Sequence, residues 1–468
     1  MFEEIPVEIG LVHEGERIRK SNMHCELGGP GIKEKFELVR VCQAETIVHG
    51  KISIIGPDLP DIPASSSQPF AILVEIAGEG LDSDIEGVLE RRIHEYCNYI
   101  QGFMHLNQRY DIWCRLSTQA WNKGFRTLRY IGEVLIALLC SELPLIKSAQ
   151  VTFFTDPVEI HKRYDDALAI YESRDARARG LHDEDVDVFY GCALCQSFAP
   201  THVCVITPER YANCGAISWF DGRAAARIDP KGPIFAIEKG VCIDPVLGEY
   251  SGVNESARDR SMGEVTRVCL YSAYTWPHTS CGCFEGIAFF IPEVEGYGIV
   301  HRGFQEVTVN GLPFSTMADS TAGGRQVAGF HGISIEYLRS GKFLAAEGGY
   351  ARVVWMPESL KEKIYSFIPA ELCDVIPTEA SVTSINELRE FLKKNNHPVI
   401  QYWNSSEINN NESEERAGSG NNPVFTFKEL PFTGNGIKIT LKNAKIYAEK
   451  VIIEPVRQKR SDKGDNHE

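Results

Sequence analysis

The sequence predicts an α/β domain over residues 1–180, an α+β domain over residues 186–400 and a small strand-rich appendage over residues 423–468. Three observations carry this prediction. Strand-like and helix-like patterns alternate over the first 185 residues, and shorter, glycine-rich elements follow from residue 188. A segment with few hydrophobic residues, 404–422, then precedes the last strand-like runs and is interpreted as a linker. A length of 468 residues is typical of about three domains.

The first domain is predicted from its strand and helix patterns. Runs of β-branched and apolar residues predict strands at residues 36–42, 46–55, 70–76 and 151–154. A helix is expected over residues 83–102, with Ser83 and Glu86 as a capping box and Gly102 as its stop. Further helices are expected over residues 125–141 and from Asp156-Pro157 onward. The charged, apolar-poor stretch 174–187 is interpreted as a hinge into the next domain.

The second domain is predicted to contain shorter elements. Helices are expected at residues 254–272, 357–366 and 384–395, and the last of these is capped by Ser384 and Glu387. The glycine-rich stretch 321–332 matches neither a phosphate-binding loop nor a dinucleotide-binding fingerprint, so we interpret it as tight turns.

Composition excludes several classes of partner and location. A net charge of −16 argues against nucleic-acid binding and against an anionic membrane surface. The N-terminus lacks the pattern of a signal peptide, and the most apolar stretch, residues 134–140, is too short to span a bilayer. We therefore expect a cytoplasmic protein, in which the 14 cysteines are reduced thiols or metal ligands and not a disulfide framework.

Four cysteines follow one another closely in the second domain. Cys192, Cys195, Cys204 and Cys214 have the spacing Cys-x2-Cys-x8-Cys-x9-Cys. Four thiolates that can surround a compact centre suit either tetrahedral zinc or an iron–sulfur cluster. The spacing alone leaves both alternatives open.

A second motif, Cys281-Gly282-Cys283, favours a different metal geometry. Two thiolates and the deprotonated amide nitrogens of Gly282 and Cys283 can lie in one plane. Such a square-planar set of two sulfurs and two nitrogens is preferred by nickel(II) or copper(II), and not by zinc. Glycine in the middle leaves room for a second metal on the sulfurs.

Together with the surrounding sequences CALCQSFAP, HVCVITPER and TSCGCFE, these six cysteines resemble the metal-cluster motif of acetyl-CoA synthases. The beginning of the chain makes it most similar to the beta-subunit family of archaeal acetyl-CoA decarbonylase/synthase complexes. The resemblance covers about residues 1–400. It makes the second domain a metal-cluster domain.

The resemblance implies an acetyltransferase of anaerobic one-carbon metabolism and methanogenesis. It implies reversible formation of acetyl-CoA from CO, a corrinoid-bound methyl group and coenzyme A at an A-cluster. This cofactor is a 4Fe-4S cluster bridged to a dinickel centre, whose proximal site also accepts copper or zinc in an inactive form.

The resemblance also implies roles for individual residues. Cys192, Cys195, Cys204 and Cys214 hold the 4Fe-4S cluster, Cys195 being the bridge to the proximal nickel, and Cys281, Gly282 and Cys283 hold the distal nickel. Phe198 lies close to the open nickel position. The implied catalytic residues are therefore Cys195, Phe198, Cys281 and Cys283.

The implied partners are CO dehydrogenase subunits, a corrinoid iron–sulfur protein, coenzyme A and, as a further candidate, ferredoxin. The chain starts at the α/β domain, without the extra domain by which bacterial members contact CO dehydrogenase, so the resemblance leaves its docking surface open. Six arginines of the first domain are candidates for binding the phosphates of coenzyme A: Arg91, Arg92, Arg109, Arg115, Arg126 and Arg129. Replacing Arg126 and Arg129 with alanine is expected to raise KM for coenzyme A.

Other interpretations remain open at this stage. A non-catalytic protein that holds only an iron–sulfur cluster or zinc for electron transfer would explain the four-cysteine motif, but not Cys281-Gly282-Cys283. His202 and His278 are expected to be hydrogen-bonded or surface histidines, and the other eight cysteines are expected to pack in the core.

Overall fold

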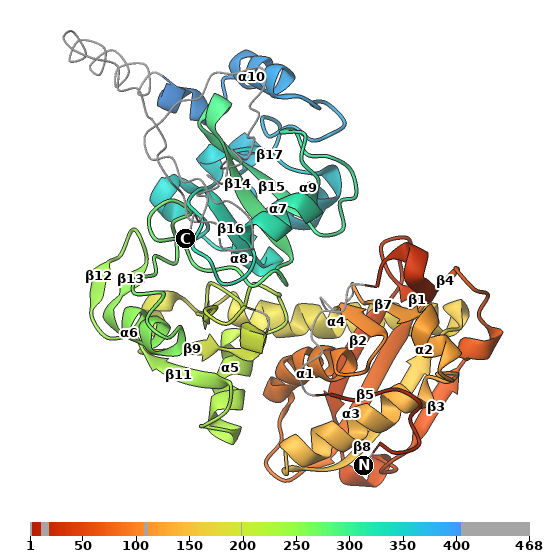
Figure 1. Ribbon diagram of the computed structural model, residues 1–468. Helices are drawn as coiled ribbons and strands as arrows, with labels where there is room; N and C mark the ends of the chain where they lie inside the picture. The colour runs from red at the N-terminus through yellow and green to blue at the C-terminus, as the bar shows by residue number, and fades with distance from the viewer. Residues whose placement is uncertain (1, 11–17, 107–110, 198, 404–468) are drawn as a thin grey trace, which may run out of the picture. The chain divides into compact units, whose positions relative to one another are not determined.

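The structure, a computed structural model, describes residues 2–10, 18–106, 111–197 and 199–403. All of them belong to one compact unit, Met1–Asn409. The predicted linker 404–422, the predicted appendage 423–468 and Phe198 lie outside the described residues. The described part is a mixed α/β structure with several sheets (Figure 1). In that part, no helix is both long and apolar enough to cross a bilayer.

Two four-stranded sheets are built from the first part of the chain. One has the order β2 (Phe36–Val41), β5 (Ala71–Gly78), β8 (Ile146–Phe154) and β3 (Ile52–Ile55). Its central strands β5 and β8 are antiparallel, and each outer strand runs parallel to its neighbour. The other sheet has the order β4 (Ser67–Gln68), β1 (Met23–Gly28), β7 (Trp113–Ser117) and β6 (Phe103–Leu106).

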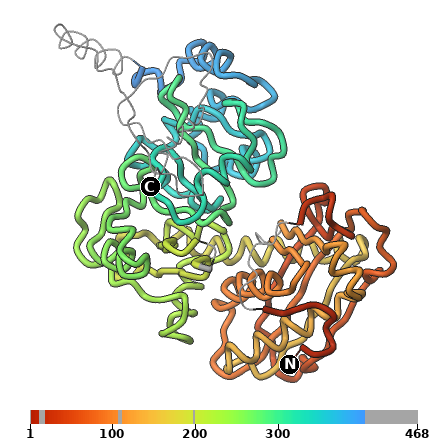
Figure 2. The backbone as a smooth tube through the Cα atoms, in the orientation of Figure 1, coloured from red at the N-terminus to blue at the C-terminus, as the bar shows by residue number. Residues whose placement is uncertain are grey.

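Four helices accompany these sheets: α1 (Glu86–Asn98), α2 (Thr118–Asn122), α3 (Arg129–Glu142) and α4 (Pro157–Ala178). Helix α1 packs on β2 and β6, and α3 packs on β8 and β3. The apolar side of α3 is buried in the large core cluster that both helices share with the strands. Figure 2 shows α4 carrying the chain from the segments coloured orange to those coloured green.

The structure confirms one predicted helix start and corrects another. Asp156 accepts hydrogen bonds from the backbone N–H groups of Val158 and Glu159, so α4 begins where the sequence predicts it. The capping box of Ser83 and Glu86 is wrong. Residues Ser83–Ile85 form a 3-10 turn capped by the side chain of Asp82, and α1 begins only at Glu86. The strand predicted at 46–55 is likewise limited to β3. A turn precedes β3, in which the N–H of Lys51 donates to the Val48 carbonyl and Gly50 has a φ of 80°.

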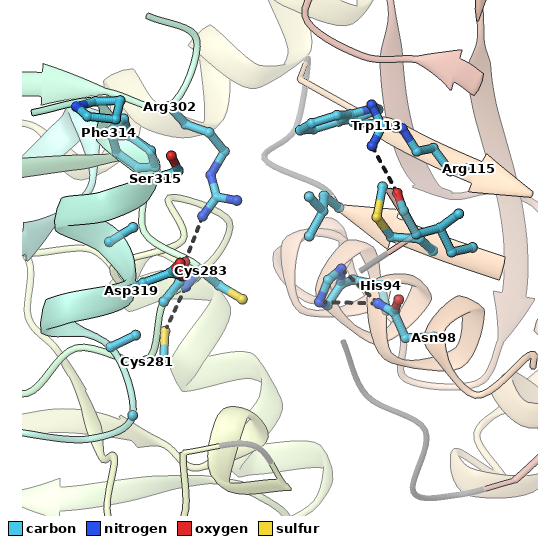
Figure 3. Close-up of a pocket in the computed structure, with 18 of the residues that line it drawn as sticks. His94, Asn98, Trp113, Arg115, Cys281, Cys283, Arg302, Phe314, Ser315 and Asp319 are labelled. Carbon is cyan, nitrogen blue, oxygen red and sulfur yellow. Dashed lines mark hydrogen bonds between the residues drawn. The ribbon is translucent and has the colours of Figure 1, made fainter. Parts of the chain in front are cut away.

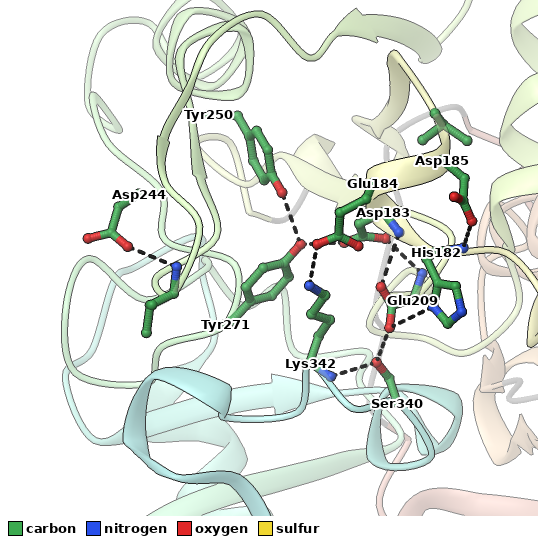
Figure 4. A network of polar contacts seen from close by, with 12 residues as sticks. His182, Asp183, Glu184, Asp185, Glu209, Asp244, Tyr250, Tyr271, Ser340 and Lys342 are labelled. Carbon is green, nitrogen blue, oxygen red and sulfur yellow. Dashed lines mark hydrogen bonds and ion pairs between the residues drawn. The ribbon is translucent and has the colours of Figure 1, made fainter.

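The predicted hinge, 174–187, is also corrected. Helix α4 continues to Ala178, because Arg174 pairs with Glu86 and Glu90 of α1 instead of facing solvent. After the helix, Asp183 is fully buried and accepts a hydrogen bond from the hydroxyl of Tyr271. Figure 4 shows the surrounding polar network. The charges that suggested a solvated hinge therefore fix this segment against its neighbours.

Three further sheets follow. The first has the order β10 (Cys204–Ile206), β9 (Val188–Cys192) and β11 (Ile234–Glu238), and β12 (Cys242–Asp244) pairs with β13 (Glu249–Tyr250). The last has the order β16 (Phe330–Ile333), β14 (Gly286–Ile291), β15 (Gly296–His301) and β17 (Val353–Trp355). The helices of this part are α5 (Trp219–Ile228), α6 (Ser251–Arg260), α7 (Phe314–Thr321), α8 (Ile335–Leu338), α9 (Glu358–Ile364) and α10 (Ile385–Lys394).

The helix predictions in this part have mixed outcomes. Those at 357–366 and 384–395 are confirmed as α9 and α10, and the Ser384 side chain accepts a hydrogen bond from the N–H of Glu387. The helix predicted at 254–272 is wrong beyond Arg260. There Met262 and Gly263 adopt left-handed backbone angles, with φ of 57° and 84°, which a right-handed helix cannot continue through.

Candidate metal centre

The cysteines of the first motif are placed by a short strand pair and the turns around it. Cys192 ends β9 and Cys204 begins β10, and the two lie directly opposite each other in the antiparallel ladder. Cys195 lies in the 3-10 turn Leu194–Ser197, and Cys214 lies in the loop before α5. All four are buried. The four thiols therefore come from one short segment, made of β9, β10 and the turns around them.

The cysteines of the second motif lie in the loop that leads into β14 and meet the first motif there. Cys195 and Cys281 pack together with Ala199, and Cys283 packs against them. The N–H of Cys283 donates a hydrogen bond to the sulfur of Cys281 at 3.3 Å. The fold thus brings Cys195 into contact with the Cys281-Gly282-Cys283 motif from a distant segment of the chain.

The backbone at Gly282 requires glycine. Its φ of +114° lies in a region that side chains with a Cβ rarely adopt, and an added Cβ would lie 3.2 Å from the Cβ of Ala322. Between α7 and β16 the glycine-rich stretch forms turns beside this loop, where the N–H of Gly324 donates a hydrogen bond to the carbonyl of Ser280. The prediction of turns over 321–332 is wrong for residues 330–332, which belong to β16. Arg302 donates another hydrogen bond to the loop, at the Gly282 carbonyl, at 2.8 Å. The loop is therefore held from two sides.

A cation from the first part of the chain reaches the thiols. Arg91 of α1 is 3% exposed, and its Nη2 donates a hydrogen bond to the Cys195 sulfur at 3.2 Å. The sequence pointed to Arg91 only as one of several arginines that could meet a phosphate. Nothing local marks it, because its partner is 104 positions away.

Burial and mutual contact shift the pKa values of these thiols in different directions. Desolvation raises the pKa of Cys192, and it raises that of Cys204 to about 11. Hydrogen bonds from Cys195 and then Cys281 hold the pKa of Cys283 well below its usual range. The three sulfurs thus favour a thiolate at Cys283, and a thiolate is the form of cysteine that binds metals.

A second buried arginine, Arg210, contacts residues that hold the first motif. Arg210 is 1% exposed and donates to the carbonyl of Val205 and to the side chain of Asn213, whose own N–H donates to the Cys204 sulfur at 3.4 Å. Its Nη2 also lies 2.9 Å from ring nitrogens of His278 and His331.

The two histidines named from the sequence are hydrogen-bonded, as expected. His202 contacts the Thr279 hydroxyl at 2.7 Å, and His278 accepts from the N–H of Val205 at 3.1 Å. Burial lowers the pKa of both, that of His202 to about 3. Both rings are therefore neutral near pH 7 and hold the scaffold of the cysteine loops.

The eight cysteines outside the two motifs were expected to pack in the core, and this expectation needs one correction. Five of them are buried and two are partly buried. Cys242 is exposed, because β12 pairs only with β13 in a two-stranded sheet and turns its side chains to solvent.

A cavity of about 690 Å³ opens onto the second motif. In Figure 3, Cys281, Cys283, Arg302 and Asp319 lie on one side of it, facing His94, Asn98, Trp113 and Arg115 on the other. Four arginines line it: Arg19, Arg115, Arg302 and Arg325. This size is typical of small-molecule sites.

His94 connects this cavity to a buried polar chain. Its Nδ1 lies 3.3 Å from Nδ1 of His105, whose Nε2 lies 2.6 Å from the Glu37 carboxylate. Burial lowers the pKa of His94 to about 3. His94 was not predicted from the sequence, because its place on a buried helix gives no local signal of this role.

The other arginines of the first domain lie in different surroundings. Arg92 pairs with Glu95 and Glu142, and Arg126 stacks on the ring of Trp121. Arg129 is bound to the Ile52 carbonyl at an exposed position. Arg109 lies outside the described residues.

Among the described residues, no three His, Cys, Asp or Glu side chains already stand at the distances of metal ligands. The thiols are nevertheless gathered in two adjoining groups beside a buried cation. A metal orders its ligands when it binds, so a ligand set need not be complete before the metal is present.

Two family models match the chain. The model described as CO dehydrogenase/acetyl-CoA synthase complex beta subunit matches residues 5–160, and the model of the C-terminal part of the ACS/CODH beta subunit matches residues 171–404.

Full-length relatives are also similar. The acetyl-CoA decarbonylase/synthase complex subunit beta of Methanothermobacter thermautotrophicus is 51% identical over 97% of this chain and 100% of its own length. That of Methanopyrus kandleri is 50% identical over 98% of this chain and 99% of its own length. The solved C-terminal domain of an acetyl-coenzyme A synthase alpha subunit is 37% identical and covers 26% of this chain and 95% of its own, with a TM-score of 0.24, which is too low to compare the folds.

Proposed function

Because the chain belongs to the beta-subunit family of CO dehydrogenase/acetyl-CoA synthase complexes, we propose that it is the catalytic acetyl-CoA synthase/decarbonylase subunit. It reversibly joins CO, a corrinoid-bound methyl group and coenzyme A to give acetyl-CoA. Its partners are CO dehydrogenase subunits and a corrinoid iron–sulfur protein, with ferredoxin as a further candidate.

The observation that carries this proposal is the contact of Cys195 with Cys281 and Cys283 beside the buried guanidinium of Arg91. Sulfur ligands from two distant segments suit a centre that extends from one motif to the other. A non-catalytic iron–sulfur or zinc protein would need only the first four cysteines.

The residues present fit the A-cluster. Cys192, Cys195, Cys204 and Cys214 would hold the 4Fe-4S cluster, and Cys281, Cys283 and the backbone nitrogen of Gly282 would hold nickel. Buried Arg91 supplies positive charge where thiolates accumulate negative charge. When bound, the metals supply a centre with soft ligands and an open coordination position for the carbon substrates.

The cavity beside Cys283 is the proposed site of coenzyme A. A diphosphate and a 3′-phosphate need cations, and the cavity concentrates arginines in a chain whose net charge is −16. Arg19 and Arg325 form no ion pair with any described residue, so no described carboxylate neutralises their charges. Arg325 also donates hydrogen bonds to the carbonyls of Ala322 and Asp319, which hold its guanidinium at the cavity. Arg115 already binds the Glu26 carboxylate, and Arg302 binds the Gly282 carbonyl. These two arginines therefore form part of the cavity lining.

Anaerobically purified protein tests the proposal through metal analysis and through exchange of the acetyl-CoA carbonyl with CO. We expect about four irons and two nickels per chain, by analogy with the A-cluster. Cys283→Ser should lose nickel and the exchange reaction but keep iron. Cys242→Ser is the matched control, because Cys242 is exposed and lies on β12. Exchange that needs no nickel would contradict the proposal.

The coenzyme A site is tested separately. Replacing both Arg19 and Arg325 with alanine should raise KM for coenzyme A about tenfold, which corresponds to about 1.4 kcal/mol from two exposed cations. Arg126→Ala is the control, because Arg126 stacks on Trp121 and does not line the cavity. An equal rise in KM in the control would move the site elsewhere.

A further inference from the structure

Arg91 is a buried cation that binds sulfur where a carboxylate would be usual. Its Nη2 donates to the Cys195 sulfur at 3.2 Å, and its Nη1 has no hydrogen-bond partner in the described part of the chain. No carboxylate of the described residues lies within ion-pair distance of it. A buried charge without a counter-charge is strongly unfavourable, so this site calls for an anion at the sulfurs.

The neighbouring residue shows the contrast. Arg92 also lies on α1, but it pairs with the carboxylates of Glu95 and Glu142 at 3.2 and 3.5 Å. Burial opposes the charged form and so lowers the pKa of Arg91, whereas the charges that raise it come from Cys195, Cys283 and Cys214 and only after them from the carboxylate of Glu95. Adjacent arginines on one helix are thus directed to two different kinds of anion.

The helix that carries Arg91 lies close to the segment after Cys214. Gly87, one helical turn earlier, lies so close to the segment after Cys214 that an added Cβ would stand 2.6 Å from the Ala216 carbonyl oxygen. Because α1 rests directly on this segment, the guanidinium reaches Cys195 from a firmly placed helix.

We propose that Arg91 is a positioning residue that neutralises and orients the sulfur–metal centre through its hydrogen bond to Cys195. This inference rests on the proposed function. Hydrogen bonds to ligand sulfurs and nearby charge both set the reduction potential of an iron–sulfur cluster. A cation at the sulfur favours the reduced cluster, which carries one more negative charge.

The test uses the full chain, purified anaerobically, as wild type, Arg91→Gln, Arg91→Lys and the control Arg92→Gln. Iron content and visible absorption are measured first, and a potentiometric titration followed by electron paramagnetic resonance comes second. In Arg91→Gln, we expect the ratio of reduced to oxidised cluster at a fixed potential to fall at least tenfold, which is about 59 mV for a one-electron couple. Arg91→Lys should recover most of the shift, and Arg92→Gln should match wild type.

Other results of the iron analysis and the potentiometric titration also decide the inference. Equal potentials in Arg91→Gln and Arg92→Gln would overturn the inference while leaving the proposed function intact. If Arg91→Gln fails to load iron but Arg91→Lys loads it, the charge is required and the inference holds. If both fail to load while folding normally, Arg91 acts through packing and the inference is overturned. A wild-type chain that binds no iron would overturn the proposed function and this inference together.

Discussion

Asp183 makes the segment after α4 sensitive to pH. The side chain is fully buried, accepts hydrogen bonds from the Tyr271 hydroxyl and the N–H of Glu209, and lies in the network of Figure 4. Burial raises the pKa of Asp183 from its ordinary 3.8 to about 6. The substitution Asp183→Asn keeps the shape of the side chain and removes its titration.

The direction in which stability changes with pH follows from the protons that the folded and unfolded states bind. Between about pH 4 and pH 6 the folded protein keeps the Asp183 proton and the unfolded chain has lost it, so stability falls as pH rises. The shift of about two units corresponds to about 3 kcal/mol in total. Above pH 6 this contribution is gone, and the folded state holds a buried carboxylate.

Thermal unfolding at several pH values between 4 and 7 measures the effect. Relative to wild type, Asp183→Asn should gain a few degrees in Tm as the pH rises across this range. Asp185→Asn is the control, because Asp185 is exposed and lies two positions along the same segment. Parallel Tm curves for wild type and Asp183→Asn would show that Asp183 does not titrate with a raised pKa in the folded protein.

Three further predictions concern the cysteine motifs and the end of the described chain. Cys192→Ala should abolish the visible iron–sulfur absorption, whereas Cys281→Ser should keep it and lose nickel in metal analysis. Gly282→Ala should destabilise its loop by about 1–3 kcal/mol, because of its φ of +114° and the contact with Ala322, and nickel retention on dialysis measures the consequence. A chain ending after Trp403, whose indole donates to the Val294 carbonyl, should keep its fold and cluster but associate more weakly with CO dehydrogenase subunits on gel filtration.

Features that depend on neighbouring residues were predictable from the sequence. The strands β2 and β5, the cap at Asp156 and the cap at Ser384 are all local patterns, and the structure confirms them. The cysteine spacing also names its candidate ligands directly.

Features that depend on tertiary contact were not predictable. Arg91 looks like any helix-surface arginine until α1 is packed against the Cys195 turn. The charged stretch after residue 174 resembles a solvated hinge, because the sequence does not reveal that Arg174 faces Glu86 and that Asp183 is buried. Charged residues that suggest solvent exposure in the sequence, such as Arg174, form ion pairs in the folded chain.

The direct pairing of Cys192 with Cys204 across β9 and β10 has a consequence for handling the protein. Residues opposite each other in an antiparallel ladder have Cα atoms about 4.5–5.5 Å apart, which lies within the range of disulfide bonds. In air, a chain that has lost its metals can therefore cross-link two of its own ligands without moving its backbone. Reloading such a protein would require a thiol reductant before any iron or nickel is added.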